Sequence, residues 1–206
     1  MDKLFNADGK FVELMNRVGD FFLLNLCFIM ACVPIVTVGP ALIALYYISI
    51  KLYKREDINV VRSYFKSFKE SMKSGLGIGI VMLFFMVIFL VDFFILFKTD
   101  AQISGLLVMG FVISFIAYLL MICYLFPLMA RYENRLVNHC KNAFILSVKY
   151  FPKTILMIIS VLVIVVSISL LVSLRPFLLI FGFATLAYLH VSLLMNIFKD
   201  LEKELN

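Results

Sequence analysis

The sequence predicts an all-α fold, a polytopic bundle of about six transmembrane helices (five is the alternative) with short amphipathic helices on the cytoplasmic side. No charged residue occurs in 101–130, 154–174 or 176–198, and a helix needs about 20 apolar residues to cross a bilayer. The 206 residues are 64% hydrophobic, with a mean hydropathy of +1.06, which no water-soluble domain could bury. Lys and Arg gather in 51–73 and 131–153, between the apolar stretches.

The whole chain, 1–206, is expected to form one integral membrane domain, because no stretch is left for a soluble one. Its expected parts are an N-terminal amphipathic helix and hairpin (8–54), a basic amphipathic connector (55–74), a hairpin (75–130), a second basic connector (131–153), a third hairpin (154–198) and a charged tail (199–206).

The first part begins with a helix over 8–20 that carries an apolar stripe at helical spacing, made of Phe11, Leu14, Met15 and Val18. We expect it to lie at the membrane interface and to run into the first span. Residues 21–50 are uncharged, and a single helix of that length would be about 45 Å long, more than the hydrocarbon core requires.

A helix-break motif divides this stretch, and its residues are Pro34, Thr37, Gly39 and Pro40. Proline disfavours helix at the residue before it, and Gly39-Pro40 is typical of a new helix start. We therefore predict two helices, 12–34 and 40–54. A single steeply tilted span is the alternative.

Residues 62–73 form the clearest amphipathic helix of the chain. Its expected apolar face is Val61, Tyr64, Phe65, Phe68 and Met72, and Arg62, Lys66, Lys69 and Lys73 repeat on the other side. Such a helix is typical of a surface connector between spans, or of a docking surface for a cytoplasmic partner or for lipid. The candidate docking residues are Arg62, Tyr64, Phe65, Lys66, Phe68, Lys69 and Lys73.

Further spans are expected at 75–97, 103–130, 154–174 and 177–198. Basic residues concentrate in alternate loops, which by the positive-inside rule places these loops and the C-terminus in the cytoplasm. The N-terminus is cytoplasmic with six helices and outside with five. Gly75 and Gly79 form a Gly-x-x-x-Gly pair, which indicates close helix packing within one chain or between two.

Four polar residues within spans are candidates for an intramembrane polar site: Asn25, Asp92, His190 and Asn196. Asp92 is the only acidic residue in a predicted span, so a coupling or substrate role is one interpretation. Pairing with Arg175 near the outer face is the other. The remaining three are more typical of hydrogen bonds between helices.

No catalytic, cofactor-binding or metal-binding residues are predicted, and we do not expect an enzyme. The serines in 160–173 have no His or Lys nearby in the sequence, and the four cysteines form no Cys-x-x-Cys pair. His139-Cys140 offers only two neighbouring residues, which do not make a structural zinc site of four ligands. Nucleic-acid binding is not expected, because the basic residues flank membrane spans.

Several stretches can be considered together: Asn25, Pro34–Ala41, Ala44–Tyr47, Tyr64–Lys69, Tyr124–Pro127, Ala130–Glu133 and Lys141–Phe144. They resemble the YesL-like family of small bacterial multi-pass membrane proteins of unknown function. The resemblance runs in order along nearly the whole chain, although this sequence has no Trp. It implies a cell-membrane protein that is often encoded beside carbohydrate-uptake and sugar-utilisation genes, and it carries no catalytic residues.

These observations lead us to expect a non-enzymatic accessory or scaffold protein of the bacterial cytoplasmic membrane, associated with carbohydrate uptake or utilisation. Its expected partners are the lipid bilayer and subunits of a membrane transporter. The alternative is a small-molecule permease formed by the helix bundle itself. The sequence leaves the oligomeric state open.

Overall fold

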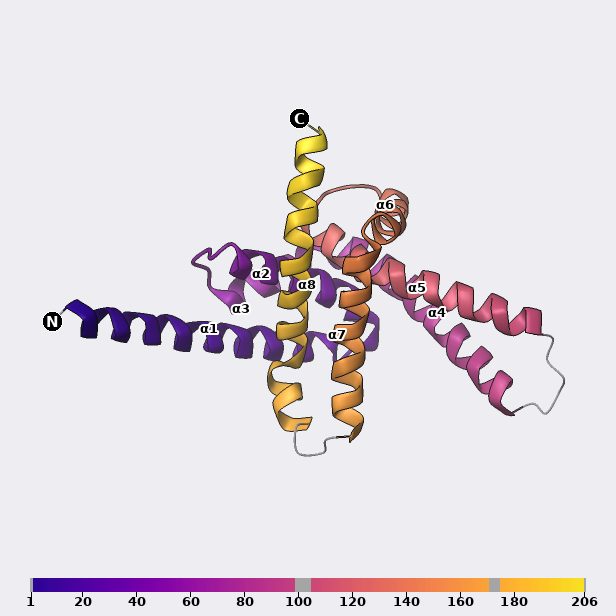
Figure 1. The fold of residues 1–206 in the computed structure, drawn as a ribbon, viewed down its shortest axis with the longest axis horizontal. Coiled ribbons are helices and arrows are strands. Elements are labelled where there is room, and N and C mark those ends of the chain that lie inside the picture. Colours follow the sequence, from indigo (N-terminus) through magenta and orange to yellow (C-terminus); the bar gives the residue numbers. More distant parts are fainter. Residues whose placement is uncertain (1, 99–104, 171–174, 206) are drawn as a thin grey trace.

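The computed structural model describes residues 2–98, 105–170 and 175–205 (Figure 1). These residues form eight α-helices and one short 3-10 helix, and they contain no β-strand. In chain order the elements are α1 (Asp2–Cys32), η1 (Ile35–Thr37), α2 (Val38–Tyr53), α3 (Val60–Glu70), α4 (Met72–Lys98), α5 (Gly105–Arg131), α6 (Leu136–Lys149), α7 (Phe151–Leu170) and α8 (Arg175–Leu205).

The predicted all-α polytopic fold is confirmed. Five segments of the described chain are long and apolar enough to span a membrane: Phe11–Cys32, Ile35–Tyr53, Met72–Ile95, Val108–Arg131 and Pro176–Lys203. A sixth is added if α6 and α7, which are bent by 100° at their junction, count as one broken span. The end of the span expected at 154–174 lies outside the described residues.

The predicted break between the first two helices is confirmed, and the alternative of one tilted helix is wrong. Pro34 is extended, with φ −79° and ψ 113°. The hydroxyl of Thr37 lies 2.6 Å from the carbonyl oxygens of both Ala31 and Pro34 and donates to them. Thr37 therefore holds the turn closed, and α2 begins at the next residue.

The helix expected over 8–20 is part of the single helix α1. Phe11, Met15 and Val18 of its apolar stripe are exposed, while the side chain of Leu14 lies outside the described ones. Figure 1 shows this half of α1 projecting away from the other helices. The stripe is therefore exposed, but the same residues begin the candidate span Phe11–Cys32, so the interfacial position of this helix stays a prediction.

The core of the protein surrounds α2, which contacts α1, α3, α4, α5 and α8. Small side chains such as Ala41, Ala44 and Ser49 are fully buried along it. In Figure 1, α1 and α2 lie across the α7–α8 pair, and α4 and α5 leave the core in a third direction. The three hairpins therefore meet at α2 and spread apart from it.

The closest contact in this core is the crossing of α2 over the start of α4. A Cβ atom on Gly39 would overlap the carbonyl oxygen of Gly75 and would lie 2.9 Å from the Cα of Gly79. A Cβ atom on Gly75 would lie 2.6 Å from the backbone nitrogen of Pro40. The Gly-x-x-x-Gly pair thus packs within one chain, against the glycine of the helix-break motif.

This crossing predicts that Gly75→Ala destabilises the folded protein by about 1–3 kcal/mol, the usual cost of overpacking, because the added Cβ atom would overlap the backbone of Pro40. The matched control is Gly110→Ala in α5, where a Cβ atom would meet nothing within 4 Å. There we expect no loss, or a gain of up to about 1 kcal/mol from helix propensity. Denaturant unfolding in detergent micelles measures both, and equal stabilities would contradict the crossing.

Candidate functional site

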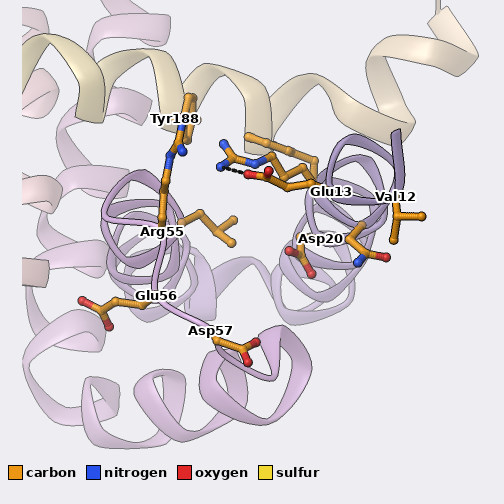
Figure 2. Close-up of a pocket in the computed structure, with 11 residues that line it drawn as sticks. Val12, Glu13, Asp20, Arg55, Glu56, Asp57 and Tyr188 are labelled. Atoms are coloured by element: carbon orange, nitrogen blue, oxygen red, sulfur yellow. Dashed lines mark hydrogen bonds and ion pairs between the residues drawn. The ribbon is translucent and has the colours of Figure 1, made fainter. Parts of the chain in front are cut away.

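The site that best combines a cavity with chemistry is a charged pocket of about 390 Å³. It lies between the N-terminal half of α1, the C-terminal end of α2 and the middle of α8 (Figure 2). We call it the charged pocket, and its lining residues are Val12, Glu13, Asn16, Arg17, Asp20, Phe21, Leu52, Arg55, Glu56, Asp57 and Tyr188.

Helix α1 supplies one wall of the charged pocket. Glu13, Arg17 and Asp20 are spaced i, i+4 and i+7, so they lie on the same face of the helix. Nη2 of Arg17 is 2.9 Å from Oε1 of Glu13, and this ion pair fixes the arginine across one turn. Phe21 continues the same wall toward α8.

The end of α2 supplies a second wall through a Schellman motif. The N–H of Arg55 donates to the carbonyl of Leu52, and the N–H of Glu56 donates to that of Lys51. Arg55 has φ 60°, the left-handed conformation that glycine usually occupies at this position and that costs other residues about 1–2 kcal/mol. The strained arginine points its side chain toward Tyr188 in Figure 2.

Tyr188 of α8 closes the charged pocket opposite Asp57. Its ring packs edge-on against Phe21 of α1, with centroids 5.1 Å apart, and lies 5.9 Å from the ring of Tyr53 of α2. Three helices therefore fix the position of this aromatic side chain. Tyr188 lies within the apolar segment Pro176–Lys203 of α8, twelve residues after its start.

Only some of the charged side chains of the charged pocket have a partner of opposite charge. Glu56 points away from the hollow in Figure 2 and pairs with Lys51 at 3.7 Å. The carboxylates of Asp20 and Asp57 repel each other, and Arg17 offsets part of this repulsion. Among the described side chains, none forms a hydrogen bond or ion pair with Asp57. Charges beside a membrane span face protein interior or water-filled cavities and commonly mark functional sites.

The structure places the predicted residue Asn25 at the crossing of α1 and α8, fully buried. Its Nδ2 donates to the carbonyl of Leu179 at 2.6 Å, and its Oδ1 accepts from the N–H of Ala184 at 3.1 Å. Both polar groups of the side-chain amide are thus used to bind the backbone of α8. This geometry matches the expected hydrogen bond between helices.

The predicted residue His190 joins three helices. Its Nδ1 is 3.0 Å from the hydroxyl of Tyr46 in α2, and its Nε2 is 2.9 Å from the hydroxyl of Ser160 in α7. The hydroxyl of Ser160 also lies 2.6 Å from the carbonyl of Met157, to which it can donate. In the tautomer with Nε2 protonated, Nε2–H donates to Ser160 and Nδ1 accepts from Tyr46. The imidazole is therefore fully hydrogen-bonded in its neutral form.

The other two candidates of the intramembrane polar site lie apart from these contacts. Asp92 is half-buried in α4, and Asn196 is exposed on α8. The suggested partner of Asp92, Arg175, has a side chain outside the described ones. In the described part of the chain the four residues do not form one site.

On α3, the structure corrects the expected apolar face. The residues buried against the core are Val60, Tyr64 and Ser67, whereas Val61 is exposed. Tyr64 donates to the carbonyl of Ala41 at 3.2 Å, and burial raises the pKa of its phenol. Tyr64 therefore anchors α3 internally and is not accessible as a docking residue. Phe65 and Phe68 are half-buried, and the basic residues Arg62, Lys66, Lys69 and Lys73 are exposed.

Sequence reasoning missed both the charged pocket and the contact between Ser160 and His190. The i, i+4, i+7 spacing of Glu13, Arg17 and Asp20 was a signal for the α1 wall. Nothing in the local sequence indicated that Arg55 adopts a left-handed conformation, or that α7 and α8 bring Ser160 to His190. Within the described residues, no group of three or more His, Cys, Asp or Glu side chains could hold a metal ion.

Residues 21–93 match a family model described as a protein of unknown function, DUF624. The match runs from α1 through the helix break, α2 and α3 into α4, and covers less than half of the 206 residues. No curated protein and no solved structure matches the chain. The similarity therefore supplies no substrate or partner.

The strain at Arg55 predicts that Arg55→Gly stabilises the protein by about 1 kcal/mol, because glycine adopts the left-handed conformation without penalty. Lys66→Gly is the matched control, an exposed cation inside α3, where glycine is expected to cost about 1 kcal/mol. Thermal unfolding in detergent measures both. A loss of stability in Arg55→Gly would contradict the assigned strain.

The role of Asn25 predicts that Asn25→Leu lowers stability by about 1–2 kcal/mol, because both hydrogen bonds of its side chain to the backbone of α8 would be lost. Asn196→Leu, at an exposed position of the same polar set, is expected to change stability little. Unfolding in mixed micelles compares the two, and equal effects would rule out a structural role for the Asn25 amide.

Proposed function

We propose that this protein is a non-enzymatic accessory or scaffold protein of the membrane, which binds a membrane partner through the basic face of α3. We define this basic face as Arg62, Lys66 and Lys69 of α3 together with Lys73, which lies at the start of α4. The observation that carries the proposal is the contrast between the two sides of α3, one buried in the core and the other exposed and cationic.

The attachment of α3 to the core supports the proposal because it fixes the position of the basic face. The side chain of Asn59 caps the helix by accepting from the N–H of Arg62 at 3.0 Å. Tyr64 is fully buried, and its ring stacks with that of Phe68. A partner would therefore meet cations that are already positioned, which lowers the entropic cost of binding.

The exposed lysines of the basic face can exchange one ion-pair partner for another. Lys66 reaches only Glu70, at 4.0 Å, and both side chains are largely exposed. Such surface pairs contribute about 0–1 kcal/mol. An acidic surface on a neighbouring protein could replace Glu70 at little cost, so the partner expected here is a membrane protein with an acidic segment at the same depth.

The placement in the cell follows from charge and resemblance. The basic loops favour a cytoplasmic position for α3 and for the C-terminus under the positive-inside rule. The resemblance to the YesL-like family favours a bacterial cytoplasmic membrane and a partner concerned with carbohydrate uptake or utilisation, such as a transporter subunit.

The hydrogen bonds around His190 support a non-enzymatic role. A hydrolase would need the Ser160 hydroxyl free to attack a substrate. Here that hydroxyl donates to a backbone carbonyl, and His190 is only 2% exposed. The contact is better suited to joining helices than to catalysis.

A small-molecule permease is the second candidate, and the charged pocket favours it. Ionisable groups within membrane spans are typical of transport pathways, and Glu13, Arg17 and Asp20 of the pocket lie within the candidate span of α1. The two functions differ in what they require: an accessory protein needs its partner, while a permease should move its substrate alone in liposomes.

The docking proposal predicts that Lys66→Glu/Lys69→Glu abolishes cross-linking of the tagged protein to its partner in native cells, because the cationic face becomes acidic. The double variant Lys141→Glu/Lys199→Glu is the matched control, since it reverses two exposed lysines elsewhere. Mass spectrometry identifies the cross-linked proteins, and membrane fractionation checks insertion. An inserted Lys66→Glu/Lys69→Glu variant that still captures the partner would refute the role of α3.

A further inference from the structure

The charged pocket carries an inference that is independent of docking by α3. We propose that it binds the headgroup of a zwitterionic phospholipid of the phosphatidylethanolamine type, with the ammonium group between Asp20 and Asp57 and the phosphodiester at Arg55. The argument rests on the charges that the protein leaves unbalanced, on the aromatic wall, and on an apolar groove that shares a residue with the pocket.

The two aspartates supply the cation site. Their carboxylates face the same hollow in Figure 2 and repel each other. A primary ammonium group between them would relieve this repulsion and donate a hydrogen bond to each carboxylate. The ring of Tyr188, held by Phe21 and Tyr53, adds an aromatic surface of the kind that attracts ammonium groups.

Arg55 supplies the anion site. The structure shows no described side chain paired with its guanidinium group, although Arg17 in the same pocket is bound to Glu13. Guanidinium groups bind phosphate oxygens through two parallel hydrogen bonds. The chain keeps an arginine where its backbone conformation favours glycine, and a ligand contact at this side chain would offset that cost.

An apolar groove next to the charged pocket indicates that the ligand has a hydrocarbon tail. The groove has a volume of about 360 Å³ and is lined by Val18, Phe21, Phe177, Phe181 and Thr185. Phe21 lines both hollows. An acyl chain that passes Phe21 would therefore lie in this groove, whereas a soluble zwitterion would leave it empty.

The position of the two hollows also favours a lipid as their ligand. Both hollows lie along α1 and α8, two helices that are long and apolar enough to span a membrane. Lipids are present there at very high local concentration, so a weak site is occupied. The choice of headgroup follows from charge: an anionic lipid without an ammonium group would place no cation between the aspartates.

The test uses the full-length protein in micelles and native mass spectrometry with defined lipids of equal chain length. We expect phosphatidylethanolamine to be retained at least tenfold more than phosphatidylglycerol. It should also exceed phosphatidylcholine, whose quaternary ammonium group has no N–H to donate. Equal retention of all three lipids would overturn the proposal.

Variants of the pocket residues test whether the lipid binds in the charged pocket. Arg55→Gly and Asp57→Asn should each reduce phosphatidylethanolamine retention at least tenfold, and the glycine variant is informative because it is not expected to impair folding. Asp200→Asn, at an exposed acid on the last turns of α8, is the matched control and should bind like the wild type. Unchanged binding in both pocket variants would place the lipid elsewhere.

Glycerophosphoethanolamine, which has the headgroup without acyl chains, separates a lipid site from a site for a soluble zwitterion. We expect it to compete at least a hundredfold less well than the intact lipid, because it does not fill the apolar groove. Equal competition would refute the lipid assignment and would identify a soluble ligand.

Discussion

The arrangement of this protein depends on one steric constraint, the backbone contact of α2 with α4 at three glycines. In a bilayer the hydrophobic effect does not drive helices together, so close packing has to supply much of the attraction. Gly39, Gly75 and Gly79 allow this because none of them has a side chain to separate the two backbones. The contact fixes α2 in the centre, where α1, α3, α5 and α8 can pack on its remaining faces.

The sequence was sufficient to predict what depends on local chemistry. Long uncharged stretches predicted the spans, and Pro34 with Gly39-Pro40 predicted the break between α1 and α2. Amphipathic spacing predicted α3 and the burial of Tyr64, with Phe65 and Phe68 packed against the core, but Val60 is buried in place of Val61. The apolar pattern around residue 60 fits either register, and only the contact with α1 and α2 decides between them.

The candidate sites were harder to predict because they depend on how distant helices cross. His190 was recognised as a hydrogen-bonding residue, yet its partners Tyr46 and Ser160 come from two other helices. The charged pocket needs the steep passage of α1 across α8, which brings Asp20 near the level of Tyr188. The spacing of residues in the sequence does not reveal the angle at which α1 and α8 cross. The residues of the charged pocket therefore could not be distinguished from ordinary surface charges.

The glycine crossing also has a consequence for the order of synthesis. Gly39 and Gly75 are separated in the chain only by the rest of α2, the short helix α3 and a few linking residues. Contacts between segments so close in the chain form early, and membrane helices emerge from the ribosome in order. The segment from α1 to α4 can therefore pack before α5 to α8 are made, and the stretch matched by the family model, residues 21–93, lies within that segment. The later helices would then assemble on a surface that already exists.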